Sequence, residues 1–268
     1  MDYYFFLKDP ETEPEITVSN FLHTHVNEFC DRKRFICLAF PQINRWTIRT
    51  VKALEPFESY TLRASELGMP ADDIAKVLVF LSPQEFDGDF DELPRVEEFP
   101  KPRFSFWRAN LRIRSKTSSV SYQGDFPSQM LDMERGTMVS ISPFFQKAHG
   151  IHNKVFVVTF RRQPASVRGH LLFRRLKNNR AIKEVDIYTN RVNSIDLSDL
   201  KLDGADELIL LMSPDTACVP IYFSHSADYR FLSLEHTHPP IELTVFGSRE
   251  KRFGAVKTMK KFWLGAKP

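Results

Sequence analysis

The chain has 268 residues, of which 42% are hydrophobic and 26% are charged, and its formal net charge is +3 at pH 7. This composition is typical of a globular protein with an extensive core. It excludes a membrane-spanning helix, because no run of about 18 apolar residues occurs. With only 10 glycines, it also gives no GxGxxG or GxxxxGK[ST] phosphate loop.

The cysteines and the N-terminal sequence indicate in which cellular compartment the protein is found. Cys30, Cys37 and Cys218 are odd in number and form no CxxC pair, so a disulfide framework is not expected. The sequence starts with an acidic second residue and has no basic segment before its short apolar patch. A secretory signal has the opposite pattern. We therefore expect a cytoplasmic protein.

Strand patterns dominate from one end of the chain to the other. Short apolar runs, which are typical of buried strands, occur at 34–40, 76–81, 154–160 and 207–212. Alternation of apolar and polar residues predicts half-buried strands over 104–115 and 182–189. Helical periodicity is confined to short segments, around 71–75 and at the centre of 248–262. These patterns predict an all-β, mainly antiparallel fold with few short helices.

Two stretches of the sequence resemble each other. Residues 60–83 contain "SEL" and end in "LSP", and residues 193–214 contain "SDL" and end in "MSP". An apolar run precedes each of the two stretches, so the similar segments follow one another in the same order in both halves of the chain. This order indicates an internal duplication. The alternative is that unrelated strands share a common pattern. Under the first interpretation, each copy forms one domain.

We predict two related β-sandwich-like domains, 16–145 and 150–247, with closure into a barrel as the alternative architecture. The first domain contains an acidic, proline-rich insertion at 82–102. The second is followed by a basic, aromatic tail at 248–268, which has seven basic residues and one acidic residue. Such a tail is suited to an anionic membrane or partner, through residues 249–263, or is simply solvated.

A candidate metal site lies in the sequence "HTHPPIE". His236 and His238 are two residues apart, so a strand would place both on one face, and Glu242 follows closely. Two imidazoles and a carboxylate can hold a divalent metal, with His225 as a further ligand. The spacing resembles the first cupin motif, but Arg230 stands where that motif has glycine. The alternative is that these histidines bond to backbone or carboxylates near a turn.

A second candidate site combines polar and aromatic groups near the end of a predicted strand. Tyr122, Gln123 and Asp125 lie where the strand gives way to a turn, and Trp107 offers a further aromatic ring. Hydrogen bonds from amide and carboxylate groups, with stacking on an aromatic face, are typical of saccharide binding. The alternative is a polar turn beside a core tyrosine.

No catalytic signature such as G-x-S-x-G occurs, so no catalytic residue is assigned. We expect a non-catalytic protein that binds a ligand or partner, above all a polar small molecule such as a saccharide, and we expect no cofactor. A balanced charge argues against nucleic acid. Two alternatives stay open: a divalent-metal enzyme that uses 236–242, and a scaffold that engages a membrane or partner through 249–263.

Overall fold

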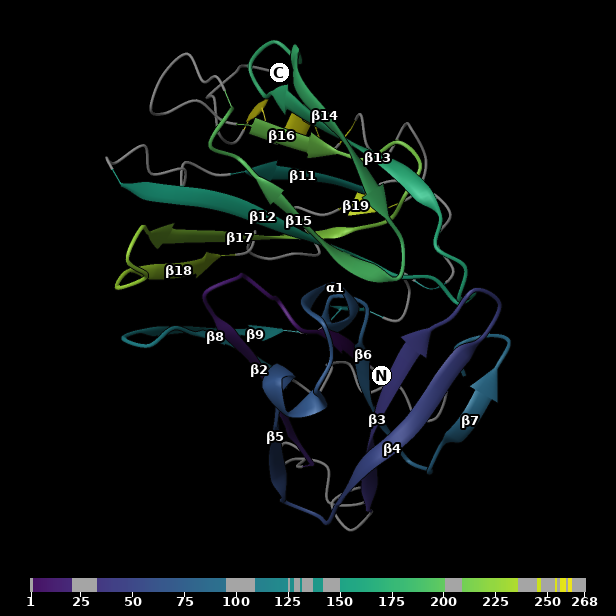
Figure 1. Ribbon diagram of the computed structural model, residues 1–268. Coiled ribbons are helices and arrows are strands. Elements are labelled where there is room, and N and C mark those ends of the chain that lie inside the picture. The colour runs from purple at the N-terminus through teal and green to yellow at the C-terminus, as the bar shows by residue number, and fades with distance from the viewer. Residues whose placement is uncertain are drawn as a thin grey trace. The chain divides into compact units, whose positions relative to one another are not determined.

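The protein is mostly antiparallel β structure, as the sequence predicts (Figure 1). Every pairing among the described strands is antiparallel, and the helices include the short η1 (Ala64–Leu67) and α1 (Ala71–Ile74). The computed structural model describes residues 2–20, 33–94, 109–124, 126–127, 131, 137–141, 150–200, 209–235, 245–246, 254, 256–258 and 260–261. The expected all-β class with few short helices is confirmed.

The chain divides into two compact units, each built from two sheets. The first unit comprises Met1–Leu131, Arg161–Ser166 and Asn190–Val192, and the second comprises Asp132–Phe160, Val167–Thr189 and Asn193–Pro268. The internal duplication and the domain boundaries at 16–145 and 150–247 stay predictions.

The first unit contains a six-stranded and a four-stranded sheet. The six-stranded sheet has the order β10 (Phe126–Pro127), β1 (Asp2–Phe5), β6 (Leu78–Ser82), β3 (Arg34–Pro41), β4 (Trp46–Leu54) and β7 (Asp87–Phe90). The four-stranded sheet has the order β5 (Ser59–Arg63), β2 (Glu13–Ser19), β8 (Ala109–Arg114) and β9 (Ser119–Gly124). The apolar runs predicted at 34–40 and 76–81 are β3 and β6, and β6 is buried along its whole length.

In the four-stranded sheet, strand alternation separates a buried face from an exposed one. Along β8, Ala109, Leu111 and Ile113 are buried and the residues between them are exposed. Leu111 lies opposite Ile16 of β2, which is also buried. Because side chains of a strand point alternately to its two faces, the core contacts of these apolar residues fix which polar residues reach the solvent.

The second unit is a sandwich whose core draws on both of its sheets. One sheet has the order β14 (Ala181–Tyr188), β13 (Arg168–Arg175), β16 (Ile209–Met212), β11 (Thr137–Ile141) and β19 (Val245–Phe246). The other has the order β15 (Arg191–Asp196), β12 (Ile151–Thr159), β17 (Val219–Ser226) and β18 (Leu232–Glu235). Val155 and Tyr222 of the second sheet belong to the same buried cluster as Leu171 and Phe173 of the first, which is the arrangement of a two-layer core.

Gly169 allows the turn after β16 to approach β13 closely. The carboxylate of Asp215 in this turn accepts a hydrogen bond from the backbone N–H of His170 at 3.1 Å and from the hydroxyl of Thr216 at 3.2 Å. A Cβ atom on Gly169 would lie 2.0 Å from Oγ1 of Thr216. A residue with a side chain therefore does not fit here unless the turn moves.

We expect Gly169→Ala to lower the free energy of unfolding by about 1–3 kcal/mol, because the added methyl group overpacks a buried contact. Urea-induced unfolding followed by circular dichroism measures this loss. Gly254→Ala is the control, since a Cβ there meets nothing within 4 Å and the residue is helical. Equal stability of Gly169→Ala and the wild type would show that the turn yields at little cost.

Candidate functional site

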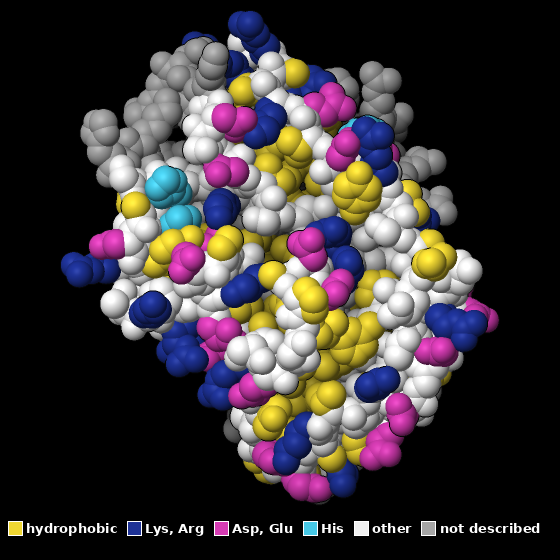
Figure 2. All heavy atoms as spheres, viewed as in Figure 1, with side chains coloured by type: hydrophobic (Ala, Val, Ile, Leu, Met, Phe, Trp, Pro, Cys, Tyr) yellow, Lys and Arg dark blue, Asp and Glu magenta, His cyan; other side chains and the backbone are white. Residues whose placement is uncertain are grey.

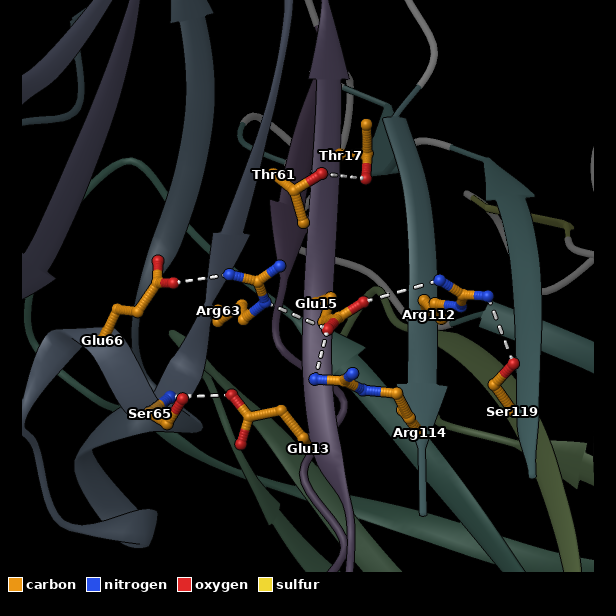
Figure 3. A network of polar contacts seen from close by, with 10 residues as sticks. All are labelled: Glu13, Glu15, Thr17, Thr61, Arg63, Ser65, Glu66, Arg112, Arg114 and Ser119. Carbon is orange, nitrogen blue, oxygen red and sulfur yellow. Dashed lines mark hydrogen bonds and ion pairs between the residues drawn. The ribbon is translucent and has the colours of Figure 1, made fainter. Parts of the chain in front are cut away.

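One side of the four-stranded sheet in the first unit carries polar side chains that contact one another across the strands (Figure 3). The register places Glu15 of β2 opposite Arg63 of β5 on one side and Arg112 of β8 on the other. Arg114 follows Arg112 two positions along β8, on the same face. We call these side chains and their polar neighbours the arginine face: Glu13, Glu15, Thr17, Thr61, Arg63, Glu66, Asn110, Arg112, Arg114 and Ser119.

The carboxylate of Glu15 is the centre of this network. Its Oε1 atom lies 3.0 Å from Nη2 of Arg114 and 3.3 Å from Nε of Arg63, and its Oε2 atom lies 3.9 Å from Nη1 of Arg112. The Glu15 side chain is 5% exposed, whereas the three arginine side chains are 45–50% exposed. A buried charge is stable only when it is paired, so the arginines compensate Glu15 and are held in place by it.

The three arginines differ in how fully they are engaged. Arg63 also binds Glu66 at 2.8 Å, and the pKa of its guanidinium is raised by that hydrogen bond first and by the one to Glu15 second. Arg112 donates to Oγ of Ser119 at 3.3 Å. Arg114 has Glu15 as its ion-pair partner in the described part of the chain. A guanidinium group has five N–H donors, so Arg112 and Arg114 keep donors for an additional acceptor.

Pairs of hydroxyl groups lie beside these contacts along β2 and β5. Oγ1 of Thr17 lies 2.8 Å from Oγ1 of Thr61, and Oγ of Ser59 donates to Oγ of Ser19 at 2.7 Å. The backbone N–H of Ser65 donates to Glu13 at 2.8 Å. The arginine face thus combines cationic donors with hydroxyl groups that can donate and accept. Such groups can donate hydrogen bonds to an anion and exchange hydrogen bonds with hydroxyl groups.

Two of the predicted saccharide residues, Tyr122 and Gln123, lie in β9 of the same sheet. Tyr122 of β9 is buried to 6% exposure and pairs with Leu111, so its ring lies on the core side. Gln123 lies in β9 opposite Asn110. Asp125 and Trp107 lie outside the described residues.

The predicted metal residues are described only in part. His225 lies in β17, whereas His236, His238 and Glu242 lie outside the described residues. Glu235, which directly precedes His236 in the sequence, pairs with Tyr222, and Tyr222 lies three positions along β17 from His225. Within the described ranges, no group of three or more histidine, cysteine, aspartate or glutamate side chains is arranged to hold a metal ion.

Two of the cysteines are packing residues. Cys37 and Cys218 are both buried and free. Burial raises the pKa of the Cys37 thiol to about 11, although a hydrogen bond with Thr50 lowers it in part. Burial also raises the pKa of Cys218 far above its usual range, and the charge of Asp215 adds to this. Neither thiol is therefore a ready nucleophile near neutral pH.

The membrane alternative and the expectation that nucleic acid is not a partner both depend on the charges of the surface. Among the described residues, no helix is long and apolar enough to cross a membrane. Lys and Arg side chains are interspersed with Asp and Glu on the face shown in Figure 2. Interspersed charges give a weaker field than a single basic stripe, which is the footprint expected for nucleic acid. Most of the segment 249–263 lies outside the described residues.

Sequence reasoning missed the arginine face. Local signals were present, because "EPEITVS" and "NLRIRS" both alternate polar and apolar residues. However, residues 15, 63 and 112 are far apart in sequence, and only the strand register brings them together.

No family model matches the chain, and comparisons with curated proteins and with solved structures also gave no match. A function must therefore be argued from the chemistry of the site itself.

We expect Glu15→Gln to destabilise the protein by about 1–2 kcal/mol, because three guanidinium groups would lose their shared counter-charge and repel one another. Thermal unfolding at low and high salt measures this loss, which should shrink as salt screens the repulsion. The control is Glu66→Gln, whose exposed carboxylate contacts Arg63 alone among the described arginines of this face. Similar losses in both variants would contradict a central role for Glu15.

Proposed function

We propose that the chain is a non-catalytic binding protein and that its arginine face binds an acidic saccharide. One observation carries this proposal: Arg63, Arg112 and Arg114 converge on a buried carboxylate and yet remain about half exposed. The arginines are thereby fixed in orientation without losing all their donors to internal partners. Preorganised donors of this kind reduce the entropy lost on binding.

The exposed guanidinium donors of Arg112 and Arg114 favour an anionic group on the ligand. Three guanidinium groups of the face contact two carboxylates, those of Glu15 and Glu66. The third carboxylate of the face, that of Glu13, accepts a hydrogen bond from the backbone N–H of Ser65, so the formal charges of the face balance. A guanidinium group binds carboxylate or sulfate oxygens through two parallel hydrogen bonds. An anion placed above Arg112 and Arg114 would reach their spare donors.

The remaining groups of the arginine face favour a hydroxyl-rich ligand. The Thr17 and Thr61 hydroxyls lie on the same face as the arginines, and Asn110 is exposed beside Arg112 on β8. Hydroxyl and amide groups match sugar hydroxyls, because both sides can donate and accept. With Tyr122 buried, recognition would rest on hydrogen bonds and charge rather than on stacking against that ring. An acidic saccharide combines the anion and the hydroxyls in one ligand.

The proposal is tested with matched oligosaccharides. Isothermal calorimetry would compare a uronate oligosaccharide with the neutral oligosaccharide of the same sugar and length. We expect the acidic ligand to bind, the neutral one to bind at least about tenfold more weakly, and the affinity to fall as salt increases.

Arg112→Gln/Arg114→Gln should weaken binding of the acidic oligosaccharide about tenfold or more, because charge-assisted hydrogen bonds are lost. Arg230→Gln in the second unit is the control, since that side chain is 80% exposed and pairs locally with Asp228. Equal binding of acidic and neutral sugars would overturn the proposal. So would unchanged affinity in the double variant, or binding confined to anionic vesicles or single-stranded DNA.

A further inference from the structure

Two histidines face each other across a pair of strands in the second unit. Strands β12 and β17 lie side by side (Figure 1), and their register pairs His152 directly with His225. Their ring centroids lie 5.2 Å apart, with an angle of 21° between the ring planes. Directly paired residues of antiparallel strands share one face of the sheet. His152 is exposed, whereas His225 is 5% exposed.

One hydrogen bond fixes the protonation pattern of the neutral His225 ring. Nδ1 of His225 lies 2.9 Å from the carbonyl oxygen of Ser226. A carbonyl oxygen only accepts, so Nδ1 carries the hydrogen and Nε2 carries the lone pair. Nε2 is buried and has no hydrogen-bond partner in the part of the chain that the structure describes. A buried acceptor without a donor is unfavourable, so this atom is suited to an external partner.

The turn after β17 holds the His225 ring in place. The ring of Tyr229 stacks on it, with centroids 4.2 Å apart and an interplanar angle of 13°. Tyr229 has a φ of 55°, which is uncommon for a bulky residue, and its N–H donates to the carbonyl oxygen of Ser226 at 3.0 Å. The same carbonyl therefore accepts from the imidazole and from the turn. The backbone conformation of Tyr229 is thus tied to the orientation of His225.

We propose that His152 and His225 bind a divalent transition-metal ion, with Nε2 of His225 as one ligand. Metal-ligating histidines typically donate the other ring N–H to a carbonyl or carboxylate, as Nδ1 of His225 does. Neutral imidazole is a preferred ligand of Zn²⁺, Ni²⁺ and Cu²⁺. The cross-strand pairing supplies a second imidazole beside the first. The two rings are stacked with nearly parallel planes, so the exposed His152 ring has to rotate for both imidazoles to hold one ion.

The number of ligands defines the kind of site. The described residues contain no cluster of three or more metal-binding side chains, whereas a structural zinc site has four protein ligands. The ion at His152 and His225 would keep positions for water or for a ligand from elsewhere. This is an exchangeable site, and it lies outside the arginine face, so neither proposal depends on the other.

The test uses Zn²⁺ itself as the probe. Isothermal calorimetry would measure Zn²⁺ binding to the wild type, His152→Ala, His225→Gln and His170→Ala. His170 is the matched control, because it is a half-exposed histidine of the second unit that lies 3.4 Å from Asp186 and 3.5 Å from Glu184. We expect the affinity to fall about tenfold or more in the first two variants and to stay unchanged in the control.

A second measurement keeps the proposal falsifiable if His225→Gln does not fold. Imidazole nitrogen shifts of the wild type would be followed by NMR during the Zn²⁺ titration, and we expect the Nε2 resonance of His225 to move. Unchanged Zn²⁺ affinity in His152→Ala, or a stationary Nε2 resonance at saturating Zn²⁺, would overturn the proposal. Loss of Zn²⁺ binding in His170→Ala alone would also overturn it.

Discussion

The period of two along a β-strand is the constraint on which both candidate sites depend. On β8, the burial of Leu111 and Ile113 obliges Arg112 and Arg114 to face outward. On β2, the burial of Ile16 places Glu15 on the outer side, where it meets those arginines. The core of the first unit therefore positions the polar network on the opposite side of these strands. A shift of one residue in either strand would move every such side chain to the opposite face.

The elements of the fold were largely predictable, because the apolar runs and alternating stretches correspond to strands. The runs at 34–40 and 154–160 are β3 and β12, and the alternation at 182–189 is β14. The sites were not predictable in the same way. Spacing predicts which residues of one strand would share a face, but it does not predict which residues meet across strands. Glu15 with Arg63, and His152 with His225, are brought together by register, which depends on the whole sheet.

Polarity alone also does not tell on which face a residue lies. Tyr122, Gln123 and Asp125 were grouped because they are close in sequence and chemically suited to a sugar. In the structure, Tyr122 pairs with Leu111 and is buried with it. A tyrosine is compatible with either face, because its ring is apolar and its hydroxyl is polar. The arginines of β8 are less ambiguous, since a guanidinium group is rarely buried without a counter-charge.

The two sites resolve the same physical problem in opposite ways. Burying a polar group is unfavourable unless a partner compensates it. For Glu15 the partners are internal, because three arginines surround the carboxylate, and their own exposed donors then become available to a ligand. For His225 one nitrogen is compensated by Ser226, and the other has no partner among the described residues. The free N–H groups of the arginine face suit a ligand that accepts hydrogen bonds. The lone pair on Nε2 of His225 suits a metal ion, which accepts an electron pair. The two units are therefore expected to bind ligands of different chemistry, each specified by what the buried polar group lacks.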